Sequence, residues 1–242
     1  MSGHSKWATI KRKKGLIDQE RGKVFQKLAK ELYVAAKLGD PNPDNNPSLR
    51  MVMDKAKAAN MPKDKVQLAI DKAKAAGAGE NYESIRYEGY GPDGVAIMVD
   101  ALTDNKNRTA SDVRSTFTKR GGNLGSDGSV SYLFDRKGII IIDKKLSEEE
   151  VMMCAIDSGA IDFITNDDNY EIYTTPEDFM NVKKALEGLG VYDYQMCEVT
   201  YFAKNYVTLD SDKQEKVMNL IDALEDLDDV QNVYHNLEVN DN

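Results

Sequence analysis

The sequence predicts an α+β protein in which a bundle of three helices precedes two sandwiches of helices packed on sheets. Three observations carry this prediction. Apolar residues recur at helical spacing through residues 20–77. Beyond Gly77, short β-prone runs alternate with helical ones. The chain has 242 residues, and one to three domains of roughly 100 to 150 residues each fit that length.

Three amphipathic helices are predicted before Gly77. The first ends near Gly39, and the turn-rich loop at residues 40–47 separates it from the second. Asn60-Met61-Pro62 separates the second from the third, where a proline suits the first helical turn because that turn does not use its N–H. Short amphipathic helices cannot bury their apolar faces separately, so we expect a small bundle. The three faces consist of Val24, Phe25, Leu28 and Leu32; Leu49, Val52, Met53 and Ala56; and Val66, Ala69, Ile70 and Ala73.

Strands and helices alternate in the remainder of the chain. Tyr82–Tyr90 and Val95–Leu102 are β-prone, and the turn residues at 91–94 between them predict a hairpin. Further strands are predicted at Ser129–Phe134, Gly138–Asp143, Ile161–Thr165, Tyr170–Thr174, Tyr194–Phe202 and Val230–Tyr234, and helices at residues 107–120, 147–158, 176–189 and 211–227. This pattern is typical of ferredoxin-like α+β sandwiches, and about 165 residues can hold two of them.

Charge is divided unevenly along the chain, whose net charge is −9. Residues 1–78 hold 17 Lys/Arg and 8 Asp/Glu, a net of +9, whereas residues 79–242 hold 15 and 33, a net of −18. The acidic part should repel nucleic acid and the basic part should attract it, so docking should be oriented. Such attraction weakens as salt rises, because bound counterions are released.

Residues 1–30 form a basic arm with nine Lys/Arg and two acids, a net of +7. A need for solubility does not explain the basic arm, because the charge of the acidic remainder already keeps the protein soluble. We interpret the arm as a flexible contact surface for a polyanion; the alternative is a solvated tail without a partner. Its single Trp stacks on a base, holds the arm in a pocket or packs on the bundle. The residues expected to contact nucleic acid are Lys6, Trp7, Lys11, Arg12, Lys13, Lys14, Arg21 and Lys23.

A second group of cations lies within the acidic part, at Arg108, Arg114, Lys119 and Arg120. We expect these residues to lie near one another on one helix and at its end, as a second nucleic-acid contact. Glycines between 121 and 128 would let backbone N–H groups approach a phosphate. The alternative is equally open: glycine and asparagine build a turn and end a helix, and the cations offset local acids.

Signals for enzymatic chemistry are weak. Neither His4 nor His235 has a partner at metal-ligand spacing, and no nucleotide-binding, metalloprotease or serine-hydrolase motif occurs. Cys154 and Cys197 lie far apart and are interpreted as buried thiols. We therefore predict a protein that is not an enzyme, with no metal, cofactor or small-molecule substrate. No signal peptide is expected, because no apolar core follows the charged N-terminus, and the longest aliphatic run, Ile139–Ile142, is too short to cross a membrane. The expected location is therefore the cytoplasm.

Several runs of the sequence resemble the YebC family, which includes the mitochondrial translational activator of cytochrome oxidase. Together they cover the chain in order from residue 3 to about 140, and their combination is highly specific. Beyond residue 145 the resemblance is one of layout. The matching runs are Gly3-His4-Ser5-Lys6-Trp7-Ala8-Thr9-Ile10-Lys11, Arg21-Gly22-Lys23, Ala35-Ala36-Lys37, Asn60-Met61-Pro62-Lys63-Asp64, Tyr87-Glu88-Gly89-Tyr90-Gly91-Pro92, Leu102-Thr103-Asp104-Asn105, Asn107-Arg108-Thr109 and Gly121-Gly122-Asn123-Leu124-Gly125.

The resemblance implies three domains: residues 1–78, residues 79–135 with 206–242, and an inserted domain at 136–205. It also implies a cytoplasmic, non-enzymatic protein. Family members are described either as DNA-binding transcriptional regulators or as ribosome-associated factors that help translation through consecutive prolines. Two departures are mild: Arg12-Lys13-Lys14 replaces a mixture of His and Arg, and Ser48 replaces an Arg, which could weaken a contact beside the bundle.

Two hypotheses for function remain. The first is a DNA-binding transcriptional regulator, and the second is a translation factor that binds ribosomal RNA through the same basic surface. A sequence-specific DNA reader usually presents a recognition helix to base edges, and the turn at residues 60–62 lacks helix-turn-helix character. Phosphate contacts from an arm fit ribosomal RNA at least as well as DNA.

Overall fold

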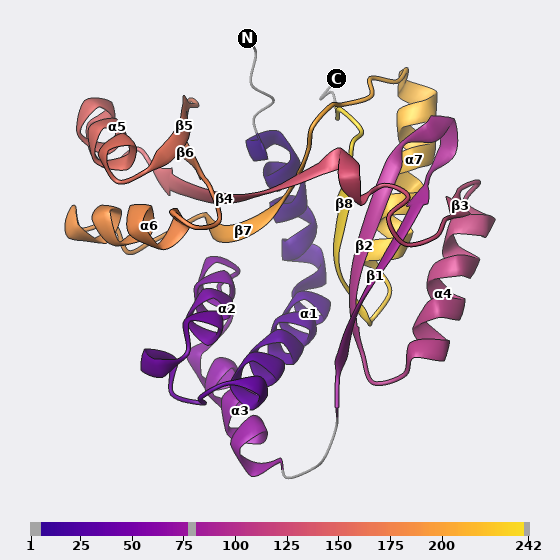
Figure 1. Cartoon of the computed structure of the whole chain (residues 1–242), viewed down its shortest axis with the longest axis horizontal. Coiled ribbons are helices and arrows are strands. Elements are labelled where there is room, and N and C mark those ends of the chain that lie inside the picture. The colour runs from indigo at the N-terminus through magenta and orange to yellow at the C-terminus, as the bar shows by residue number, and fades with distance from the viewer. Residues whose placement is uncertain (1–5, 77–80, 240–242) are drawn as a thin grey trace. The chain divides into compact units, whose positions relative to one another are not determined.

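The computed structural model describes residues 6–76 and 81–239, with side chains from Arg21 onward. Within these ranges it contains seven α-helices and two four-stranded antiparallel sheets, which confirms the predicted α+β fold (Figure 1). The chain divides into two compact units, one of residues 1–74 with 136–200 and one of residues 75–135 with 201–242. The division into three domains that the family resemblance implies stays a prediction.

The first unit begins with three helices, α1 (Lys6–Leu38), α2 (Pro47–Ala58) and α3 (Lys63–Ala75). α1 has 33 residues, and at 1.5 Å per residue it is about 50 Å long. The prediction of a flexible arm before residue 20 is therefore wrong, because residues 6–20 continue this helix. No proline interrupts residues 6–38, and the segment is rich in Lys, Arg, Ala and Leu, which favour helix.

Asn46 fixes the turn between α1 and α2. Its side-chain oxygen accepts a hydrogen bond from the Leu49 N–H at 3.0 Å, a cap that in general contributes about 1 kcal/mol. Its amide nitrogen donates to the carbonyl oxygens of Ala35 and Asp40, both at 2.8 Å. Because Asn46 is buried, these bonds hold the loop against the end of α1.

The second part of this unit is a sandwich of two helices on a sheet. Its strands are in the order β5-β6-β4-β7, and its chain order is βαββαβ, which together are the ferredoxin-like arrangement. Ile140, Ile142 and Ile172 of the sheet pack with the buried side chains of both helices. The elements are β4 (Phe134–Asp143), α5 (Glu148–Asp157), β5 (Ala160–Thr165), β6 (Asn169–Thr174), α6 (Phe179–Gly188) and β7 (Met196–Ala203).

A buried ion pair joins the two parts of the first unit. The Lys183 ammonium of α6 lies 2.9 Å from the Asp54 carboxylate of α2 and 3.2 Å from Glu187. Burial by itself lowers the pKa of Lys183, but hydrogen bonds from its ammonium to these carboxylates outweigh burial and raise that pKa. Met51 of α2 also packs on the apolar core of the sandwich. α2 is thus a shared element of the helices and the sandwich.

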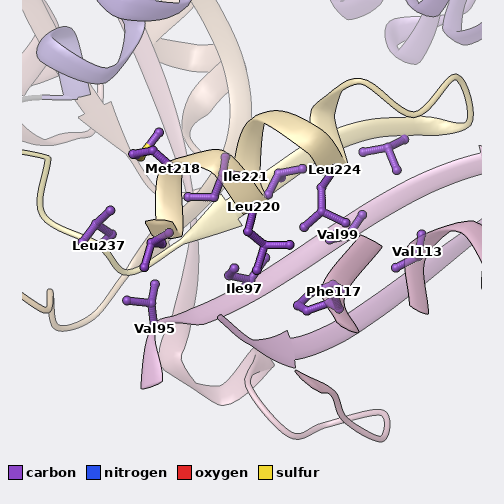
Figure 2. Close-up of a cluster of buried hydrophobic side chains, with 13 residues drawn as sticks. Val95, Ile97, Val99, Val113, Phe117, Met218, Leu220, Ile221, Leu224 and Leu237 are labelled. Carbon is purple, nitrogen blue, oxygen red and sulfur yellow. The ribbon is translucent and has the colours of Figure 1, made fainter. Parts of the chain in front are cut away.

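The second unit has the sheet order β3-β1-β2-β8. Figure 2 shows its core, where Ile97 and Val99 of β2 lie against Phe117 of α4 and against Leu220 and Leu224 of α7. Both helices therefore cover one face of this sheet, as expected of an α+β sandwich. The elements are β1 (Glu83–Tyr90), β2 (Ala96–Thr103), α4 (Lys106–Lys119), β3 (Asn123–Leu124), α7 (Ser211–Glu225) and β8 (Val230–His235).

Two local predictions have different outcomes. The hairpin is confirmed: β1 and β2 pair from Glu83↔Thr103 to Tyr90↔Ala96, and the turn contains Gly94 at φ 78°. The strand predicted at Ser129–Phe134 is wrong, because Ser131–Leu133 form a 3₁₀ turn and β4 begins only at Phe134. The carboxylate of Glu88 accepts the N–H groups of Val130 and Ser131, which are then not available to a neighbouring strand.

Candidate nucleic-acid interface

α1 concentrates positive charge on one helix. Residues 6–38 hold ten Lys/Arg against three Asp/Glu, a net of +7. Of the predicted contact residues on this helix, the structure describes the side chains of Arg21 and Lys23, and both residues are exposed. The side chains of Lys6, Trp7, Lys11, Arg12, Lys13 and Lys14 lie outside the described residues, so their roles stay predictions.

α3 adds further lysines, some of them accompanied by acids. Lys63, Lys65, Lys72 and Lys74 are exposed. The Lys65 ammonium lies 5.2 Å from the centre of the Phe25 ring, a cation–π contact between α3 and α1. The exposed acids Asp64 and Asp71 belong to the same helix. The net charge of α3 is therefore only +2, from four Lys and two Asp.

The lysines of α2 have structural partners. The Lys55 ammonium lies 2.8 Å from Glu31 of α1 and 3.7 Å from Glu198 of β7. The Lys57 ammonium lies 2.8 Å from Asp193 and donates to the Tyr192 carbonyl at 2.9 Å. The lysines of α2 are thus neutralised by carboxylates of the same unit. α1 and α3 are therefore the better candidates for the nucleic-acid surface.

Arg108 belongs to a structural network around Asp229. The Asp229 carboxylate is buried and accepts hydrogen bonds from Arg108 at 2.7 Å and from the Thr109 and Thr103 hydroxyls at 2.8 and 3.2 Å. Arg108 also contacts Asp104 at 2.9 Å, and the carboxylates of Asp229 and Asp104 raise its pKa. The guanidinium is thus already engaged by carboxylates.

The surroundings of Arg108 do not suit a phosphate. A pocket of about 500 Å³ lies beside it, and four of the seven lining residues are aspartates. Such a lining repels an anion. The pocket is lined by Arg108, Thr109, Asp112, Asp226, Leu227, Asp228 and Asp229.

The prediction that Arg108, Arg114, Lys119 and Arg120 lie near one another is wrong. α4 places Arg108 in its first turn and Lys119 at its last residue, and eleven residues of α-helix span roughly 16 Å. Arg114, Lys119 and Arg120 are exposed and have no ion pair within residues 21–76 and 81–239. At 100° per residue, Arg114 faces about 140° away from Lys119. Only Lys119 and Arg120 are neighbours, so the four cations do not form one cluster.

The glycine-rich segment after α4 is explained by packing. Its N–H groups are already used: Gly122 donates to the Phe117 carbonyl, and Gly125 to that of Glu88, both at 2.8 Å. Gly128 donates to the Glu88 carboxylate at 3.0 Å. A Cβ at Gly122 would lie 2.8 Å from the Tyr90 carbonyl oxygen, which explains why a glycine stands there. The arrangement favours the turn interpretation over a phosphate cradle.

The described residues contain no group of His, Cys, Asp and Glu arranged to hold a metal ion. Within those same residues, no helix has the length and apolar content that spanning a membrane requires. Cys154 and Cys197 are free thiols; Cys197 is buried as predicted, whereas Cys154 is only partly buried, so that part of the prediction is wrong. Sequence reasoning missed the structural importance of Glu88, Asp229 and Lys183. The only signal for Glu88 and Lys183 was a charged residue within a strand or helix, and Asp229 lies in the turn before β8.

Two family models match this chain. One, described as the TACO1/YebC protein N-terminal domain, matches residues 5–76, and the other, described as the TACO1/YebC second and third domain, matches residues 82–237. The chain belongs to the TACO1/YebC family. The resemblance noted in the sequence is thereby confirmed. The models leave only the segment between the two ranges and the ends of this TACO1/YebC chain unmatched.

Relatives of this TACO1/YebC protein carry regulatory names. A probable transcriptional regulatory protein of Geobacillus thermodenitrificans is 55% identical over 241 residues, covering 98% of this chain and 97% of the relative. Another of that name from Lactobacillus acidophilus is 54% identical over 237 residues, covering 97% of each chain. The crystal structure of a conserved hypothetical protein from Aquifex aeolicus is 47% identical, with a TM-score of 0.81 and 93% of each chain covered. These names support a regulatory role.

Proposed function

We propose that this protein regulates gene expression by binding nucleic acid through its basic helical segment. The observation that supports this proposal is the uneven distribution of net charge. Residues 1–78 carry +9, of which α1 carries +7, and residues 79–242 carry −18. A continuous basic helix presents its cations along roughly 50 Å, a length that can follow a nucleic-acid backbone. The acidic remainder restricts docking to this segment, because it repels phosphates.

The first form of the proposal is a DNA-binding transcriptional regulator, as the names of the relatives suggest. The lysines and arginines of α1 would contact phosphates, and Trp7 would stack on a base or hold the helix end in a pocket. Arg114, Lys119 and Arg120 are secondary contacts, because they are exposed but scattered over α4 and its end. The proposal assigns no catalytic residue, metal, cofactor or membrane.

The second form is a translation factor that binds ribosomal RNA. The observation that favours it is the surface of α3, the helix that follows the turn after α2. Its exposed residues include Asp64 and Asp71, which the phosphates on either side of a major groove repel. Contact dominated by phosphates does not require a base-reading helix, and it suits the exposed backbone of ribosomal RNA.

Sedimentation separates the two forms. Tagged protein in a lysate is run through a sucrose gradient, with and without a high-salt wash. Co-migration with ribosomes that the wash abolishes supports the translation form, and enrichment with chromosomal DNA at low salt supports the transcription form. Trp7 is the single Trp, so tryptophan fluorescence reports on this residue alone. That fluorescence should change on titration with either nucleic acid. A protein that migrates free of both at low salt would refute the proposal.

A further inference from the structure

The outer face of α5 exposes two large apolar side chains. Val151 and Ala155 point into the core of the sandwich and are fully buried. Met153 and Ile156, three residues apart and therefore neighbours on the helix surface, lie on the opposite side, with exposed fractions of 57% and 54%. A surface helix ordinarily carries polar residues there, because its apolar stripe faces the core. α5 is thus apolar on both sides.

The neighbouring edge strand also exposes an apolar side chain. β5 begins three residues after α5, contacts that helix and pairs only with β6. Its residue Ile161 is 54% exposed. The register with β6 shifts between Ala160 and Asp162, so Ile161 has no partner opposite it. Met153 and Ile156 define what we call the α5 face, and Ile161 is an exposed apolar residue close to them in the sequence.

The chain segment that carries the α5 face is acidic in sequence. Residues 146–182 hold ten Asp/Glu and no Lys, Arg or His, a net of −10 within 37 residues. Asp157 and Asp162 directly follow Ile156 and Ile161, Glu149 stands one helical turn before Met153, and all three acids are exposed. An apolar centre with a charged rim is the usual composition of a protein–protein interface, and the sign of the rim selects the partner.

We propose that the α5 face binds a basic, amphipathic segment of another protein. Nucleic acid and anionic lipid are both repelled by a net charge of −10. A second copy that docked by two-fold symmetry would bring each acidic rim against its own equivalent. A segment with apolar residues on one side and Lys or Arg beside them meets both the apolar centre and the rim. Met153 also adapts readily to different apolar partners. This partner is additional to the nucleic acid of the proposed function.

The test uses the full chain and a defined probe, a fluorescent amphipathic helical peptide of alternating Leu and Lys clusters. Binding is measured by anisotropy for the wild type and for the double variant Met153→Ser with Ile156→Ser. The double variant should weaken binding by about tenfold or more, because the apolar centre is removed. The matched control is Leu68→Ser on α3, where an equally exposed leucine (57%) lies outside the α5 face and binding should be unchanged.

A second probe, a Lys-only peptide of equal charge, separates specific docking from simple charge attraction. It should bind more weakly than the amphipathic peptide and should not distinguish the three proteins. Equal binding of both peptides, or full binding by the double variant, would overturn the proposal. Dimerisation of the wild type that the double variant loses, measured by analytical ultracentrifugation, would instead assign the face to a second copy and also overturn it. Thermal melting checks that each variant is folded.

Discussion

At the scale of single residues, the cations of α4 have different functions although they share one helix. Arg108 neutralises Asp229, which is buried and also accepts two hydroxyl groups. Removing the guanidinium leaves that carboxylate without its counter-charge, and an uncompensated buried charge is strongly destabilising. We expect Arg108→Ala to lower the Tm measured by calorimetry. Arg114→Ala, on the exposed part of the same helix, should leave the Tm nearly unchanged.

Binding measurements complete this comparison. Lys119→Ala with Arg120→Ala should leave the Tm as it is and reduce nucleic-acid affinity modestly, because exposed cations contribute to a polyanion complex without contributing to folding. An Arg108→Ala variant with the wild-type Tm would contradict the structural role given to this residue.

Glu88 predicts a dependence of stability on pH. Burial raises the pKa of its carboxyl group, but the N–H groups of Val130, Gly128 and Ser131 outweigh burial and hold that pKa below its usual value of 4.5. A carboxyl group whose pKa is lower when folded than when unfolded stabilises the fold above the unfolded pKa, and this stabilisation is lost as the pH falls through the folded pKa. Glu88→Gln should therefore lower the Tm at pH 7, by the loss of about 2 kcal/mol of charge-assisted hydrogen bonding.

The difference in Tm between wild type and Glu88→Gln should shrink as the pH falls from about 4.5 through the lower pKa of the folded protein, because the carboxyl is protonated first in the unfolded and then in the folded state. Calorimetry at about pH 7 and about pH 3 measures it. A difference that is the same at both values would show that the charge of Glu88 does not contribute to holding the loop.

At the scale of elements, α2 is the contact between the helices and the sandwich of the first unit. A double-mutant cycle on Lys183→Ala and Asp54→Ala should give a coupling free energy of about 1 to 3 kcal/mol, because the ammonium is buried and in contact with the carboxylate. Urea unfolding of the four proteins measures it. The pair Lys57–Asp193, also formed by α2 but largely exposed, is the matched control and should couple far more weakly. Equal coupling in both cycles would contradict the account.

The elements differ in how well the sequence could predict them. Alternation of apolar residues and the turn at 91–94 were sufficient to predict the β1–β2 hairpin. Apolar residues at helical spacing were sufficient to predict most helices. The strand predicted at Ser129–Phe134 failed because Glu88, some forty residues earlier, takes the N–H groups that a strand would need. Helix α1 was predicted too short because its first turns lack an apolar stripe, while their backbone propensity still favours helix. Patterns of apolar residues therefore miss two things: hydrogen bonds between residues far apart in the sequence, and helices that form by backbone propensity without an apolar stripe.

The candidate site was predictable in part for the same reason. Charge counting alone was sufficient to identify the basic segment. It also grouped Arg108 with Arg120, because counting does not reveal that Arg108 faces two carboxylates and that a whole helix separates the two residues. The distinction between a cation that binds a ligand and one that neutralises a neighbour depends on interactions between residues distant in sequence.

At the scale of the whole molecule, a charge of +9 on one segment and −18 on the remainder makes binding to a polyanion dependent on a small part of the chain. The acidic remainder contributes repulsion, which is screened by salt like the attraction. The variant that tests this division changes Lys11, Arg12, Lys13 and Lys14 to Ala. Its matched control makes the same change in net charge at four exposed cations of the remainder, Arg136, Lys144, Lys145 and Lys204.

The most direct measurement is the slope of log affinity against log salt concentration, taken for wild type and both variants with a ribosomal RNA fragment and with duplex DNA. Each phosphate that α1 no longer neutralises should reduce the slope by roughly 0.7 for single strands and 0.9 for duplex DNA, so four lost contacts should lower it by up to about 2.8 and about 3.6 respectively. The control variant should keep the wild-type slope and bind slightly more weakly. A wild-type slope in the α1 variant, with its helical content intact by circular dichroism, would contradict the claim that the basic helix binds nucleic acid.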